Sequence, residues 1–156
     1  MDIIAKLLND KFDFTEIVYD LSEVKKVANL NKIPILACSK LLKDLDPFEH
    51  SWNVTSDSIA AYISNILEAK LLIATNVDGI YTRKPTLAKS HFIDEIDAKK
   101  LLNFDETSVD LILAELLLEF GSNCFVVNGN YPERVLSIIN NNIDVYKFKY
   151  TYIRGD

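Results

Sequence analysis

The chain has 156 residues, and its 17 Lys and Arg against 23 Asp and Glu give a formal net charge of −6. No cluster of four or more basic residues occurs, so nucleic acid is not an expected partner. The chain has four glycines, all more than six residues apart, which excludes a P-loop or a G-x-G-x-x-G phosphate loop. The sequence contains no membrane-length apolar stretch and no signal peptide, so it predicts one cytoplasmic domain over residues 1–156 without a membrane partner.

The first third of the chain alternates helical and strand periods. Apolar spacing and capping residues predict a helix over 1–10, a strand over 16–19, a helix from Ser22 to about 29, a strand over 33–38 and a long loop or a broken helical turn over 40–54. Cys38 and Cys124 both lie in apolar runs. We therefore expect two buried, reduced thiols and no disulfide.

The same alternation continues to the end of the chain. The predicted elements are a helix from a Thr55 or Ser56 cap to 67, a strand over 71–75, a turn over 76–79, a loop over 82–95 with a short strand at 92–93, a helix from a Thr107 or Ser108 cap to Gly121, a strand over 124–127, a turn at 128–129, a helix from Pro132 to 139 and an edge strand over 145–153. The final Arg154-Gly155-Asp156 is expected to be a tail. Recurrent strand–helix–strand units predict an α/β fold with a largely parallel sheet.

In such a fold, ligands bind beyond the carboxyl ends of the strands, which indicates the loops 39–56, 76–85 and 128–131. The polar segment 50–58 leads into a helix N-terminus and suits either an anion or ordinary capping. Asp78-Gly79 is a turn dipeptide. The carboxylates of Asp105, Glu106 and Asp110 complement a helix dipole or, alternatively, help to hold Mg²⁺.

The order of several motifs carries a resemblance to a known family. These are Thr55-Ser56-Asp57-Ser58, then residues 72–81 with the letters LIATNVDGIY, then Ser108-Val109-Asp110, then FVVNG at 125–129. Together they resemble the amino acid kinase superfamily. The letters EHSW at 49–52 and PERV at 132–135 look similar to an archaeal branch of methanofuran-biosynthesis kinases, which phosphorylate an aminomethylfuran phosphate.

The resemblance implies a three-layer α/β/α fold, ATP and Mg²⁺ as cofactors, and a homo-oligomer. By the same resemblance, the catalytic residue is Asp57, and the substrate-binding residues are His50, Trp52, Thr55 and Ser56. The nucleotide-binding residues that it implies are Thr75, Asn76, Asp78, Gly79, Tyr81, Lys84 and Asp110. Many relatives have Asp where this chain has Asn76, and other branches carry a lysine where it has Asp110.

The family's N-terminal K-x-G-G-S segment does not occur in this sequence. That segment holds the transferring phosphoryl group, so we expect weak or no phosphoryl transfer by this chain alone. The chain thus resembles the C-terminal two-thirds of a small-molecule kinase. Its implied acceptor is a phosphate or carboxylate, with a phosphorylated furan first and a nucleoside monophosphate or isopentenyl phosphate next. The alternative is a non-catalytic nucleotide-binding or dimerising remnant.

Overall fold

The computed structural model describes residues 2–104, 107–143 and 147–156. The chain divides into two compact units, Met1–Glu49 and His50–Asp156. The single domain that the sequence indicates stays a prediction. Among the described residues, no helix has the length and apolar character needed to cross a membrane.

The first unit pairs two parallel strands with helices. Its elements are α1 (Asp2–Lys11), β1 (Thr15–Val18), α2 (Leu21–Asn29), β2 (Ile33–Leu36) and α3 (Ser39–Leu45). One prediction needs correction. The cap of α2 is Asp20, whose carboxylate accepts a hydrogen bond from the Ser22 backbone at 2.7 Å, because a carboxylate is a stronger acceptor than a hydroxyl. Helix α3 occupies the start of the segment 40–54, which agrees with the helical alternative predicted there.

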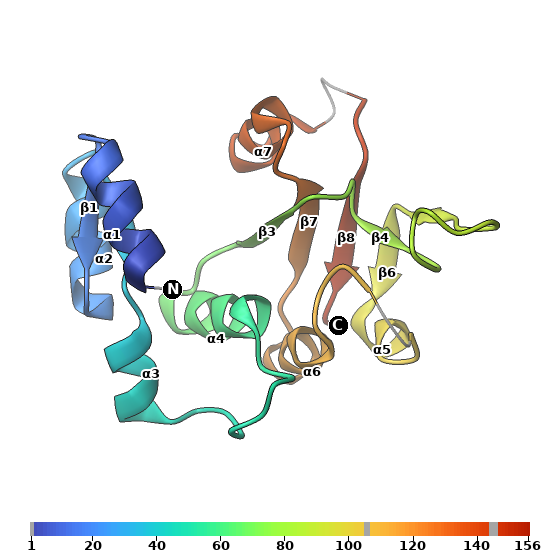
Figure 1. The fold of residues 1–156 in the computed structure, drawn as a ribbon, viewed down its shortest axis with the longest axis horizontal. Helices are drawn as coiled ribbons and strands as arrows, with labels where there is room; N and C mark the ends of the chain where they lie inside the picture. Colours follow the sequence, from blue (N-terminus) through green and yellow to red (C-terminus); the bar gives the residue numbers. More distant parts are fainter. Residues whose placement is uncertain (1, 105–106, 144–146) are drawn as a thin grey trace. The chain divides into compact units, whose positions relative to one another are not determined.

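The second unit carries the larger sheet (Figure 1). Its elements in chain order are α4 (Ser56–Leu67), β3 (Leu71–Thr75), β4 (Ile80–Tyr81), β5 (Phe92–Ile93), β6 (Glu95–Asp97), α5 (Ala98–Leu101), α6 (Leu111–Phe120), β7 (Cys124–Asn128), α7 (Pro132–Ile139) and β8 (Tyr150–Arg154). Most of these follow the predicted order. The short β4, β6 and α5 were not predicted, because two to four residues carry too little periodicity to be recognised.

The four-stranded sheet has the order β3-β7-β8-β6. β3 pairs with β7 in parallel, β8 pairs with β6 in parallel, and β7 and β8 are antiparallel. The α/β class with a mainly parallel sheet is therefore confirmed. The prediction of β8 as an edge strand is wrong, because β8 lies between β7 and β6 and buries Thr151 and Ile153 completely. Residues 145 and 146 of the predicted strand lie outside the described residues.

The core of this unit lies between the sheet and the helices. Helices α4 and α6 contact one another, and α7 lies apart from them beside β7 (Figure 1). Leu113 and Leu117 of α6 are fully buried, as is Cys124 of β7. Burial raises the pKa of the Cys124 thiol far above its usual range. Both cysteines are buried and free, which confirms the prediction.

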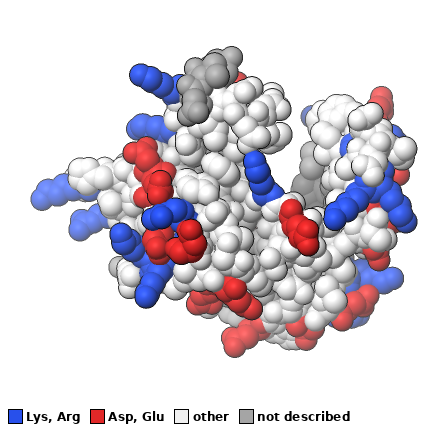
Figure 2. Space-filling model, turned by 180° about the vertical axis from the view of Figure 1, so that it is seen from behind, with Lys and Arg blue, Asp and Glu red and all other residues white. Residues whose placement is uncertain are grey.

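The C-terminus is also packed, which corrects the expectation of a tail. Arg154 ends β8 and pairs with Glu95 at 2.9 Å, and the Gly155 backbone N–H donates to Asn123 Oδ1 at 3.1 Å. On the face drawn in Figure 2, the Lys and Arg side chains of the described residues are interspersed with Asp and Glu. That mixture of charge fits the expectation from composition, and the absence of a nucleic-acid partner stays a prediction.

Candidate functional site

Asp110 joins the N-termini of two helices. Its Oδ1 accepts a hydrogen bond from the Leu113 backbone at 2.6 Å and so caps α6. Its Oδ2 accepts from Thr55 Oγ1 at 2.5 Å and from the Ser58 hydroxyl and backbone at 3.1 and 3.2 Å, at the start of α4. The predicted cap of α6, Thr107 or Ser108, is therefore wrong, because the Asp110 carboxylate can serve both helices at once. The predicted Thr55 cap of α4 is confirmed, with a capping box to Ser58.

Asp57 lies in the first turn of α4, half-buried beside this junction. Burial raises its pKa, and the negative charge of Asp110 raises it further. Hydrogen bonds from the Asp110 backbone and the Ser56 side chain oppose this rise without cancelling it. A carboxylate with a raised pKa next to a second carboxylate is the kind of environment found at catalytic sites and also in structural clusters.

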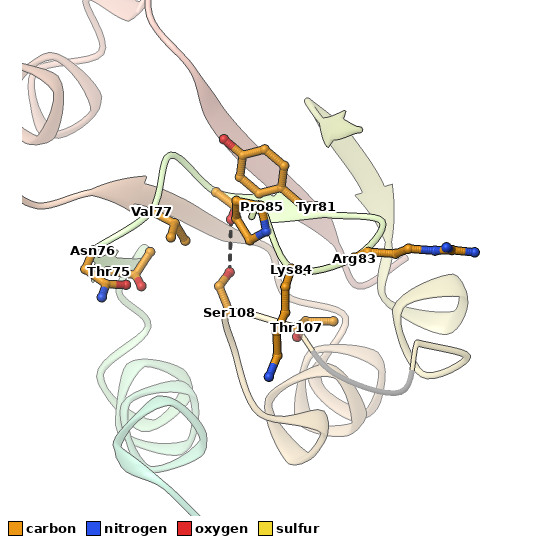
Figure 3. Close-up of a pocket in the computed structure, with 10 residues that line it drawn as sticks. Thr75, Asn76, Val77, Tyr81, Arg83, Lys84, Pro85, Thr107 and Ser108 are labelled. Carbon is orange, nitrogen blue, oxygen red and sulfur yellow. Dashed lines mark hydrogen bonds between the residues drawn. The ribbon is translucent and has the colours of Figure 1, made fainter. Parts of the chain in front are cut away.

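A pocket of about 190 Å³ opens at the carboxyl end of β3 (Figure 3). Its lining residues come from the end of β3, the β4–β5 hairpin and the segment before α6: Thr75, Asn76, Val77, Gly79, Tyr81, Arg83, Lys84, Pro85, Thr107 and Ser108. In Figure 3, Arg83 extends away from the other labelled side chains, whereas Lys84 reaches towards Thr107 and Ser108. Ser108 lies two residues before Asp110, so the pocket and the helix junction share one stretch of chain.

The backbone at Gly79 is constrained by its own φ angle and by the side chains of Thr151 and Ser108. Its φ is +152°, which L side chains rarely adopt, and a Cβ there would overlap the Thr151 hydroxyl. Thr151 Oγ1 accepts a hydrogen bond from the Ile80 backbone at 2.8 Å and donates to the Ile93 carbonyl at 2.6 Å. Ser108 Oγ donates to the Gly79 carbonyl at 3.1 Å. These contacts fix where the hairpin with Tyr81 and Lys84 begins.

Asp78 lies on the other side of the same loop and is not among the lining residues. Its Oδ1 accepts from Arg134 Nη1 at 2.7 Å and from Asn128 Nδ2 at 3.3 Å. Asn128 ends β7, where it is the register partner of Thr75 in β3. The carboxyl ends of these two strands therefore lie next to each other, as expected for a site in a parallel sheet.

The structure brings most of the predicted nucleotide residues together and leaves two predicted substrate residues apart from them. His50 and Trp52 are exposed in the segment before α4, and neither lines the pocket. Asp105 and Glu106, the alternative Mg²⁺ ligands, lie outside the described residues. Arg134 and Thr151 were not identified from the sequence, because each acts on residues more than 50 positions away.

Comparisons with known proteins identify the family of this chain. The model of the amino acid kinase family matches residues 5–128, most of the chain. The chain belongs to the amino acid kinase family. The chain is 41% identical over 130 residues to the [5-(aminomethyl)furan-3-yl]methyl phosphate kinase of Methanocaldococcus jannaschii. It is 26% identical over 143 residues to a uridylate kinase of Methanococcus aeolicus. The resemblance to the family and to the branch that acts on an aminomethylfuran phosphate is thereby confirmed.

The aligned regions cover 82% and 85% of this chain and 58% of each of these two relatives. The chain thus spans somewhat more than half of their length. Among solved structures, the UMP kinase of Ureaplasma parvum matches with a TM-score of 0.74 at 20% identity, covering 98% of this chain and 67% of that one. The uridylate kinase of Archaeoglobus fulgidus matches with a TM-score of 0.69 at 19% identity, covering 97% and 67%. These likenesses establish the amino acid kinase fold and confirm the predicted fold class.

Proposed function

We propose that this chain contributes the nucleotide-binding part of an ATP-dependent small-molecule kinase. The observation that carries the proposal is the pocket at the carboxyl end of β3, built from the segment Thr75 to Tyr81 together with Lys84. Main-chain groups, hydroxyls and one lysine suit a nucleotide with its phosphates. The volume of about 190 Å³ is below the roughly 300–1,000 Å³ of pockets that enclose whole ligands, so the pocket suits part of a nucleotide.

Asp57 is the proposed catalytic carboxylate, and Asp110 positions it. Both oxygens of Asp110 accept hydrogen bonds at the two helix starts, so this residue is committed to holding α4 and α6 together. Asp57 is held half-buried at that junction. We assign Thr55 and Ser56, at the start of α4, to the phosphoryl acceptor, because backbone N–H groups at a helix N-terminus favour an anion.

Mg²⁺ is the metal proposed to accompany ATP. Among the described residues, no group of three or more His, Cys, Asp or Glu is placed to hold a metal ion by itself. Kinases commonly hold Mg²⁺ with one or two carboxylates and the phosphates of the substrate, and Asp57 fits that role here. When bound, Mg²⁺ neutralises charge on the transferring phosphoryl group.

The proposed acceptor is a small molecule that already carries a phosphate, with an aminomethylfuran phosphate first. This choice rests on the relative of that name at 41% identity, and UMP is the next candidate because of the uridylate kinases at lower identity. Trp52, fully exposed and close in sequence to the start of α4, is proposed with His50 to contact the acceptor.

The test of the nucleotide site is a calorimetric titration of Mg·ATP into protein shown to be folded by circular dichroism. We expect binding that Lys84→Gln weakens, since the lysine charge attracts phosphate. Lys25→Gln, at an exposed position of α2, is the matched control and is expected to bind like the wild type. Absence of binding by the folded wild type at millimolar nucleotide would refute the proposal.

A second candidate is a protein that binds nucleotide without catalysing transfer. It is favoured by the pocket lining, which accounts for nucleotide contacts but does not include Asp57, the proposed catalytic carboxylate. An assay of ADP formation with aminomethylfuran phosphate and, separately, UMP distinguishes the two candidates. Turnover by the chain alone supports the kinase, and binding without turnover supports the second candidate.

Self-association is proposed from the exposed apolar side of α1. Ile3, Ile4 and Leu7 of this helix are 80%, 57% and 61% exposed. Apolar residues grouped on one helix surface are typical of an interface. Light scattering coupled to size exclusion is expected to give more than the 17.7 kDa of one chain, and a mass that stays at one chain at high concentration would refute this assignment.

A further inference from the structure

The loop between β3 and β4 is held from outside the pocket by the start of α7. Val77 and Gly79 line the pocket, whereas Asp78 between them accepts hydrogen bonds from Arg134 and Asn128. Arg134 is not a lining residue either. Asp78 and Arg134 therefore support the loop that lines the pocket without lining the pocket themselves.

The Arg134 guanidinium is itself held in place. Its central carbon lies 3.9 Å from the centre of the Tyr131 ring, in cation–π contact. The Arg134 and Asp78 side chains are only 19% and 27% exposed, whereas Arg154 and Glu95 are 46% and 57% exposed. A partly buried ion pair is weakened less by solvent than an exposed one, and breaking it leaves a poorly solvated charge behind.

A main-chain hydrogen bond also joins the turn after β7 to the end of β3. The Gly129 N–H, in the turn after β7, donates to the Thr75 carbonyl at 2.8 Å, and Asn128 Oδ1 accepts from the Asn130 N–H at 3.1 Å. The turn that leads into α7 is thus tied to the end of β3. The Asp78–Arg134 pair adds a side-chain tie to the next part of the same loop.

We propose that Asp78 and Arg134 act as a positioning pair for the nucleotide pocket. The pair fixes the loop that presents Val77 and Gly79, and Arg134 neutralises a carboxylate close to where an anionic ligand binds. Neither residue needs to touch the ligand. This inference rests on the proposed nucleotide site and adds to it a role for Arg134 and an indirect role for Asp78.

The experiment measures Mg·ATP affinity by calorimetry for the full chain and for Arg134→Gln, Asp78→Asn and the double variant. Arg134→Gln is expected to raise Kd by about three- to tenfold, as for loss of a partly buried pair. The double variant is expected to lose no more than Arg134→Gln alone, because removing both partners leaves no uncompensated carboxylate. If the two side chains contacted the ligand independently, their losses would add, and the double variant would bind Mg·ATP most weakly.

Two controls separate positioning from general destabilisation. Arg154→Gln removes the exposed pair with Glu95, and Ile153→Val removes a buried methyl group from β8. Both are expected to keep the wild-type Kd. An Arg134→Gln variant that binds like the wild type, or losses that add in the double variant, would overturn the inference.

A second measurement keeps the inference separate from the proposed function. If the folded wild type does not bind ATP, the proposed function is refuted, and hydrogen exchange then decides the role of the pair. Amides of residues 76–80 are expected to exchange faster in Arg134→Gln than in the wild type or Arg154→Gln. Unchanged exchange there would overturn the inference by itself.

Discussion

Replacing Thr151 with valine removes the hydroxyl that holds the start of the pocket hairpin. Thr151 is fully buried on β8, and its Oγ1 connects the Ile80 N–H and the Ile93 carbonyl at 2.8 and 2.6 Å. Valine has nearly the same shape as threonine but places a methyl group against both backbone groups. The change therefore removes hydrogen bonds without opening a large cavity.

The expected cost follows from those two contacts. A buried polar group left without a partner costs about 1–3 kcal/mol, and with two such groups Thr151→Val is expected to lower the free energy of unfolding by about 2–6 kcal/mol. That decrease is a large part of the free energy of unfolding of an ordinary domain, which is roughly 5–15 kcal/mol. Thr151→Ser keeps the hydroxyl and loses one methyl group, at about 1 kcal/mol.

Urea unfolding followed by circular dichroism measures the difference in free energy of unfolding between each variant and the wild type. Fluorescence is less suitable, because the single tryptophan, Trp52, is already fully exposed in the folded protein. Thr86→Val, at an exposed position between β4 and β5, is the control and is expected to stay within about 0.5 kcal/mol of the wild type. The reasoning fails if Thr151→Val also stays within that margin, or if the serine variant loses as much as the valine variant.

The remaining predictions concern a carboxylate, the thiols and a glycine. Burial raises the pKa of Asp57, so its ionised form lowers the stability of the folded state. In urea unfolding at pH 7, Asp57→Asn is therefore expected to be more stable than the wild type. This difference in stability should vanish as the pH falls below about 4, where the wild-type carboxyl is protonated in both the folded and the unfolded state. Cys38 and Cys124 are expected to resist a thiol reagent in native protein and to react after denaturation; fast native labelling would contradict their burial. Gly155→Ala would place a Cβ against backbone carbonyl oxygens near the end of α6. We expect the free energy of unfolding in the same urea assay to fall by more than about 2 kcal/mol. A variant as stable as the wild type would refute this expectation.

The local pattern was sufficient for most helices and strands. The apolar run at 71–75 and the Pro132 start of α7 match the structure, because strand burial and helix caps depend on residues next to one another. The pattern was insufficient for β8, predicted at the edge but placed between β7 and β6. Alternating burial is the same whether a strand has one neighbour or two, so the sequence could not reveal that position.

The sequence by itself determined the α/β class, the buried thiols, the order of motifs and the family they indicate. Only the tertiary structure decided how the candidate site is held together. Asp110 reaches α4 across 52 positions, and Asp78 meets Arg134 across 56. Such contacts depend on the path of the whole chain, because the sheet brings the carboxyl ends of β3 and β7 together, and local periodicity carries no record of that path.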